Sequence, residues 1–151
     1  MKQSIRKSVI VLALGAASMM AAAGALADEW PLVAGEYWEV TGIDIKDGGA
    51  LKYAEFLAGE WKENLEFSKS QGWIKSYMIF SNVYARANEP DLYLVTVTDS
   101  IVSGAESEKR DDAYMAWRKK TIAQMESESG NRAEYREVMS SSLLQELKIR
   151  K

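Results

Sequence analysis

Asn82 is the residue whose type and position most suggest ligand chemistry, because it is a polar amide within the apolar run WIKSYMIFSNVYA. An amide on a strand inside an apolar pocket could hydrogen-bond a ligand carbonyl or enolate. The alternative interpretation is a β-bulge or an amide whose hydrogen bonds are satisfied within the core. Tyr77, Tyr84 and Tyr93 could donate phenolic protons to a ligand, or could be sheet aromatics with one end in water.

These residues suggest a binding set rather than a catalytic set. We predict that a small ligand contacts one amide, four aromatic side chains and one thioether, namely Asn82, Tyr84, Tyr93, Phe80, Met78 and Trp38. Trp38 has a second interpretation, which it shares with Trp61, Trp73 and Trp117: each is simply explained as an anchor of the core or of a dimer interface. No catalytic residue can be assigned from these patterns.

The residue types that are missing exclude several chemistries. The chain contains no Cys and no His, so it has no thiolate nucleophile, no imidazole base and no ordinary zinc, copper or haem ligand set. The acidic runs at Glu106–Glu108 and Asp111–Asp112 lack the loop spacing and the glycine of a calcium motif. They are better explained as the solvated start of a helix, where acids are favourable. We therefore predict no metal and no cofactor.

The first half of the chain is expected to position the candidate residues on a sheet. A strand over Glu36–Lys46 is rich in β-branched and aromatic residues. An amphipathic helix over Ala50–Gln71 follows, and Gly72 ends it in the left-handed position usual for a helix cap. The run Trp73–Thr98 then forms an antiparallel hairpin with RANEPD as its turn. A pairing of Tyr84 with Tyr93 would place Met78 and Phe80 on the face that carries Asn82, although sequence alone does not fix the register.

The second half is expected to add helices and a last strand to this sheet. A polar loop over Asp99–Glu108 leads to a helix over Lys109–Glu128, which Gly130 interrupts. A short helix over Asn131–Ser140 and a last strand over Ser142–Ile149 complete the chain. The order β-α-β-β-α-β, with one extra helical turn, predicts an α+β fold of the ferredoxin-like, split βαβ kind.

The amino terminus has the features of a secretory signal. Lys2, Arg6 and Lys7 precede an Ala-rich apolar segment, and the sequence ALA at 25–27 predicts cleavage before Asp28. We expect residues 1–27 to be a cleaved signal peptide, 28–35 an arm, 36–151 the folded domain, and the mature protein to be periplasmic or secreted with no stable membrane anchor.

Charge limits the partners of the mature protein. Cleavage would remove three of the 19 bases and none of the 22 acids, which leaves 16 bases and a net charge of −6. An acidic domain is poorly matched to nucleic acid.

A homodimer is predicted from the sheet. A ferredoxin-like sheet with helices on one face would leave an aromatic and aliphatic face bare, and a two-fold homodimer would cover it.

A known family shares part of this pattern. The segment KDGGALKYAEFLAGEWKENLEFSKSQGWIKSYMIF, followed by EPDLYLVTVTD, resembles the dimeric α+β barrel superfamily, which includes NIPSNAP-like, EthD-like and antibiotic-biosynthesis-monooxygenase-like proteins. The resemblance covers roughly residues 36–149 and implies a ferredoxin-like homodimer. Members with known chemistry often use a His, which this chain lacks, whereas the cofactor-free oxygenases surround an apolar pocket with aromatic and amide side chains.

Three functions follow as hypotheses. The first is an exported homodimer that binds a small apolar or aromatic molecule between sheet and helices. The second is a cofactor-free oxygenase, in which Asn82 and nearby aromatic residues orient a substrate that itself activates oxygen. The third is a structural or partner-binding periplasmic protein with a filled interior. The sequence leaves open whether the protein is an enzyme.

Overall fold

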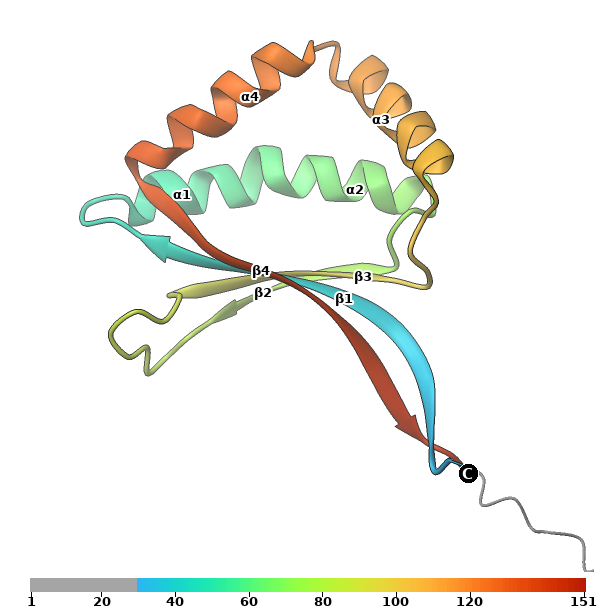
Figure 1. Cartoon of the computed structure of the whole chain (residues 1–151). Coiled ribbons are helices and arrows are strands. Elements are labelled where there is room, and N and C mark those ends of the chain that lie inside the picture. Colours follow the sequence, from blue (N-terminus) through green and yellow to red (C-terminus); the bar gives the residue numbers. More distant parts are fainter. Residues whose placement is uncertain (1–29) are drawn as a thin grey trace, which may run out of the picture.

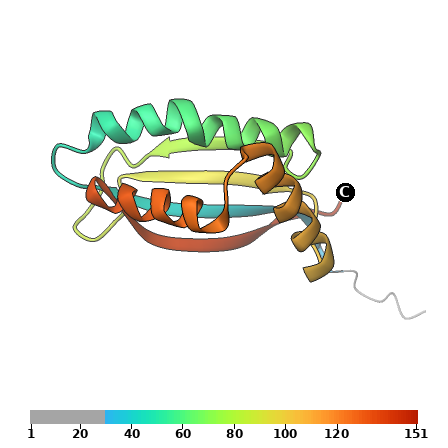
Figure 2. The same ribbon diagram turned by 90° about the horizontal axis from the view of Figure 1, so that it is seen from above.

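The computed structural model describes residues 30–151 as an α+β fold with one antiparallel sheet (Figure 1). The four strands lie in the order β2 (Ser76–Ser81), β3 (Leu92–Thr98), β1 (Leu32–Ile45) and β4 (Arg136–Ile149). All the helices lie over one face of the sheet (Figures 1 and 2). The sheet of the single chain is open, so the predicted barrel is not closed by one chain. The predicted signal peptide, residues 1–27, lies outside the described residues. No helix within 30–151 is long and apolar enough to cross a membrane.

β1 (Leu32–Ile45) is the centre of the sheet and pairs with β3 (Leu92–Thr98) and β4 (Arg136–Ile149). It begins at Leu32 rather than at the predicted Glu36, because Leu32–Ala34 pair with the end of β4. An irregularity in the ladder separates this extension from the rest of the strand. Much of the segment expected to be an arm is therefore part of the sheet.

One long helix follows β1, as the sequence predicts. It consists of α1 (Ala50–Phe56), a π-helical turn η1 (Leu57–Trp61) and α2 (Lys62–Ser70). Gly72 follows it with φ 70°, in the predicted left-handed conformation.

The hairpin forms with a different register from the one considered in the sequence analysis. β2 (Ser76–Ser81) pairs Phe80, rather than Tyr84, with Tyr93. The backbone N–H of Asn82 donates to the Asp91 carbonyl at 2.8 Å, which closes a longer loop and removes Tyr84 from the ladder. The two registers differ by an even number of residues, so each strand residue keeps its predicted face.

The helices after β3 differ from the prediction. The single helix predicted over Lys109–Glu128 is wrong, because the chain forms α3 (Gly104–Arg118) and α4 (Ile122–Asn131). Lys119 ends α3 with a left-handed φ of 54°. Thr121 then begins α4 with a capping box, in which its side chain and that of Gln124 bond each other's backbone N–H groups.

The segment before the last strand is also different. Gly130 lies inside α4, and the helix predicted over Asn131–Ser140 is wrong. A 3₁₀ turn η2 (Arg132–Glu134) leads directly into β4, which begins at Arg136 rather than at Ser142. The added residues pair with the carboxyl end of β1, so sheet pairing overrides the local helical pattern.

The two faces of the sheet have different surroundings. The helix-facing side carries the core cluster of Ile43, Tyr53, Leu57 and Leu94. The opposite face has no covering helix in the part of the chain that the structure describes (Figure 1). Strand alternation and the ladder register give this face mainly apolar side chains, namely Trp38, Val40, Met78, Phe80, Tyr93, Val95, Val97 and Leu144.

Candidate functional site

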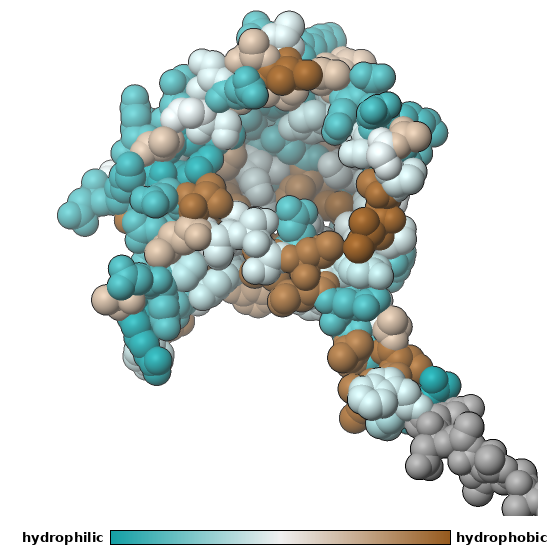
Figure 3. Space-filling view, viewed as in Figure 1, coloured by the Kyte–Doolittle hydropathy of each residue, from teal (hydrophilic) through white to brown (hydrophobic). Residues whose placement is uncertain are grey.

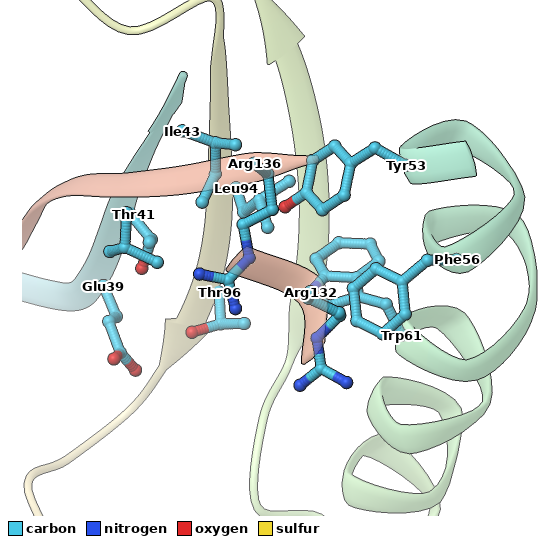
Figure 4. A pocket seen from close by; sticks show the side chains of 11 residues that line it. Glu39, Thr41, Ile43, Tyr53, Phe56, Trp61, Leu94, Thr96, Arg132 and Arg136 are labelled. Carbon is cyan, nitrogen blue, oxygen red and sulfur yellow. The ribbon is translucent and has the colours of Figure 1, made fainter. Parts of the chain in front are cut away.

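A cavity of about 270 Å³ lies between the sheet and the helices (Figure 4). Its floor comes from alternate residues of β1, β3 and β4, and its walls come from α1, η1 and η2. The space-filling view shows a recess between the helical layer and the sheet (Figure 3). The lining combines aromatic, aliphatic, hydroxyl and charged side chains: Glu39, Thr41, Ile43, Tyr53, Phe56, Trp61, Leu94, Thr96, Arg132, Arg136 and Val138.

The long helix supplies the aromatic wall. The rings of Tyr53 and Phe56 stack with centroids 5.8 Å apart. The rings of Trp61 and Tyr77 are nearly perpendicular, with centroids 5.4 Å apart. A π-turn contains more residues than an α-turn, so η1 keeps Trp61 on the side of the helix that carries Tyr53 and Leu57. Single π-turns of this kind are frequent at functional sites.

The turn into β4 supplies two arginines. The Tyr135 N–H donates to the Arg132 carbonyl at 3.2 Å, so Arg132 and Arg136 flank a tight turn at the edge of the cavity. The Arg132 guanidinium lies over the Phe56 ring, 4.5 Å from its centroid. Arg136 has no ion pair with any described residue, and Figure 4 shows its side chain on the cavity side of β4. These two side chains give the cavity a cationic edge.

An ion-pair network ties the cavity to the outer helices. Glu60 lies 3.0 Å from Arg118 and 3.9 Å from Arg132, and Glu128 lies 3.9 Å from Arg118 and 2.5 Å from Lys120. The hydrogen bond from Lys120 is the main reason that the pKa of Glu128 is lowered. Three cations share two carboxylates, so the network retains a positive charge. The Nε atoms of Arg118 and Arg132 are buried and have no hydrogen-bond partner among the described residues.

Tyr53 is the most enclosed polar residue of the cavity lining, since only 1% of its surface is exposed. Burial raises its pKa to about 12, and the charges of Arg136 and Arg132 oppose this effect only in part. Its hydroxyl therefore remains a neutral donor at physiological pH. Figure 4 shows that hydroxyl directed toward Arg136, where it could donate to a ligand oxygen.

The residues predicted from the sequence lie elsewhere. Asn82 is in the hairpin loop, where its side-chain amide donates to the Pro90 carbonyl at 3.1 Å and to Glu89 at 3.4 Å. Tyr84 is 89% exposed in the same loop. The other four predicted residues lie in the sheet, on the face away from the helices: Trp38, Met78, Phe80 and Tyr93. None of the six predicted residues lines the cavity.

Tyr77, the third tyrosine considered as a donor, does lie on the helix side of the sheet. Its hydroxyl donates to Glu66, and this hydrogen bond is the first cause of its raised pKa. Its ring is an outer neighbour of Trp61 and does not line the cavity. The hydroxyl is therefore already engaged on the outer side of the helix.

Sequence reasoning missed the arginine pair. Arg132 and Arg136 fall in a segment predicted to be a helix, where residues four apart lie on one exposed face. The available signal is the pair of arginines on either side of Tyr135. That signal points to the cavity only when the chain is known to change from a turn to a strand between them.

Within residues 30–151, no group of three or more potential ligands (Asp, Glu, His or Cys) could hold a metal ion.

The fold and the cavity define an α+β protein with an open antiparallel sheet and a pocket that has an aromatic wall and a cationic edge. Comparison with protein-family models, with curated proteins and with solved structures finds no match to this chain. The function is therefore inferred from the site itself.

Proposed function

We propose that this protein is an exported homodimer that binds a small aromatic molecule in the cavity between its sheet and its long helix. The observation that carries the proposal is the cavity itself, whose wall is formed by Tyr53, Phe56 and Trp61 and whose opposite side is polar. Ligand sites typically combine apolar walls with a few polar groups that fix orientation. The combination of aromatic and charged side chains around this opening of about 270 Å³ next to the core favours binding over a purely structural role.

The strand order supports a ferredoxin-like assignment within the dimeric α+β barrel group. All neighbouring strands are antiparallel, β1 and β3 occupy the centre, and the connecting helices lie on one face. These features support the split βαβ pattern as a hypothesis.

The bare face of the sheet supports the homodimer. Phe80 is 49% exposed and Leu144 is 54% exposed there, beside the apolar side chains of β1 and β3. An apolar sheet face of this extent is typical of an interaction surface. A second copy would cover it with an identical, self-complementary face, as two-fold dimers do. Export is supported by the signal-like segment at residues 1–27.

Binding is better supported than the cofactor-free oxygenase hypothesis. That hypothesis assigns substrate orientation to Asn82, whose amide is bonded to Glu89 and Pro90 outside the cavity. The cavity instead offers two arginines, hydroxyl groups, a phenol that stays neutral and one carboxylate, Glu39. The arginines, the hydroxyl groups and the phenol can bind and orient a ligand through charge and hydrogen bonds.

Thermal unfolding with a panel of small aromatic compounds tests the proposal. Thr96→Phe would place a ring in the cavity, and Thr98→Phe would add the same ring to the same strand outside it. We expect compounds to raise the melting temperature of the wild type and of Thr98→Phe but not of Thr96→Phe. Ligand at 100 times its Kd adds about 2.7 kcal/mol of stability. Equal shifts in all three proteins would place binding outside the cavity and contradict the proposal.

A further inference from the structure

We propose that the ligand of this cavity is an aromatic carboxylate, whose negative charge is held by Arg132 and Arg136. The inference rests on the proposed function and adds the chemical class of the ligand. It depends on the charges that line the cavity rather than on its apolar wall.

Arg136 is the first part of the argument. It begins β4, lines the cavity, and forms no ion pair with any described residue. A cation that is partly withdrawn from water without a counter-ion loses hydration that nothing in the protein replaces. A ligand carboxylate would restore that interaction, and a guanidinium is suited to it because two of its N–H groups can bond both carboxylate oxygens.

Arg132 is the second part. Its side chain is mostly buried, and its position over the Phe56 ring fixes its direction. The nearest carboxylate, Glu60, is 3.9 Å away and lies closer to Arg118, at 3.0 Å. Arg132 is therefore only weakly neutralised, and its Nε has no partner in the described part of the chain.

The other polar groups define how the ligand would lie. Figure 4 places Arg136 between the aromatic wall and Glu39, the one carboxylate that lines the cavity, and shows Arg132 beside Phe56. Glu39 forms no ion pair with either arginine in the described chain. A carboxylate beside the arginines would also receive a hydrogen bond from the neutral Tyr53 hydroxyl, while the ring of the ligand would contact Phe56 and Trp61. Aromatic rings in such contacts favour stacked or edge-to-face geometry.

Calorimetric titration with matched acid and amide pairs tests this assignment. We would use benzoate with benzamide, naphthoate with naphthamide, and phenylacetate with phenylacetamide, at neutral pH where each acid is ionised. The wild-type protein should bind the acid of at least one pair about tenfold more tightly than its amide, the scale of one charge-assisted hydrogen bond. Arg136→Gln should lower the affinity for the acid until it is close to the affinity for the amide.

Two further variants keep the result interpretable. Lys52→Gln removes an exposed cation that lies outside the cavity. It should leave the preference for the acid over the amide unchanged if that preference comes from the two arginines rather than from the net charge of the protein. Arg136→Lys keeps the charge but loses the planar fork, so it should retain part of the preference if Arg136→Gln fails to fold.

The outcomes separate the two proposals. Equal affinity for acid and amide in the wild type would overturn the carboxylate assignment and leave the aromatic-binding function standing. A preference that survives in well-folded Arg136→Gln and Arg132→Gln would also overturn the assignment. Absence of binding by all six compounds would overturn the proposed function, and this inference with it.

Discussion

The ion pair between Glu60 and Arg118 joins the long helix to α3 and gives a prediction that can be worked out from the structure. The Arg118 side chain is only 11% exposed, and Glu60 is 33% exposed. Replacing Arg118 with Met keeps much of the volume but removes the cation 3.0 Å from Glu60. The remaining partner of Glu60 would be Arg132, at 3.9 Å.

The cost of this change lies below that of breaking a fully buried pair. Removing one partner of a buried pair costs about 3–5 kcal/mol. Glu60 keeps a third of its side chain in water, and Arg132 is close enough to move toward it, so we expect about 2 kcal/mol for Arg118→Met. Glu60→Gln in the same background should recover part of this loss, which gives a coupling energy of about 1 kcal/mol in a double-mutant cycle.

Urea unfolding of the wild type, both single variants and the double variant measures this coupling. All four proteins must be compared at one protein concentration, because dimerisation would make stability depend on concentration. If the two single changes add to within about 0.3 kcal/mol, the pair does not stabilise the helical layer and the reasoning is refuted.

Three other perturbations have defined outcomes. Burial raises the pKa of Tyr53 in the folded protein to about 12 from the ordinary value of 10.0, so the unfolded chain loses this proton first as the pH rises. Urea unfolding should therefore show about 2 kcal/mol less stability at pH 12 than at pH 10. The loss of stability should be smaller in Tyr53→Phe. Phe80→Asp on the bare sheet face should give a folded monomer by light scattering, whereas Val83→Asp, in the exposed loop, should remain dimeric. If both variants remain dimeric, the sheet face is not the interface. Glu39→Gln should strengthen naphthoate binding several-fold in calorimetry because it removes a like charge, and an equal gain for naphthamide would contradict this explanation.

Periodicity in the first half of the chain predicted the long helix and two of the three strands that line the cavity. The apolar stripe over residues 50–71 and the glycine after it are local signals, and the structure has the helix and its left-handed end at Gly72. The alternation within the hairpin predicted the faces of β2 and β3, because an even shift in register does not exchange them.

The missed features depend on contacts between distant residues. The strand conformation at Arg136 is imposed by pairing with Ile45 of β1, although the local pattern resembles a helix. The break at Lys119 requires a left-handed residue that is not a glycine. The side-chain amide of Asn82 has a hydrogen-bond partner in its own loop, the Pro90 carbonyl, which the sequence pattern did not indicate. The cationic side of the cavity could be found only after these turns were placed.

Native mass spectrometry of the mature protein, purified from its own host, tests the central claim most directly. Our account predicts a dimer that carries the added mass of a small aromatic acid, and predicts that Thr96→Phe, purified in the same way, lacks that mass. A wild-type protein without added mass, even after incubation with the aromatic acids and amides used in calorimetry, would contradict the account. A monomer that does carry such a mass would retain the cavity and refute the dimer.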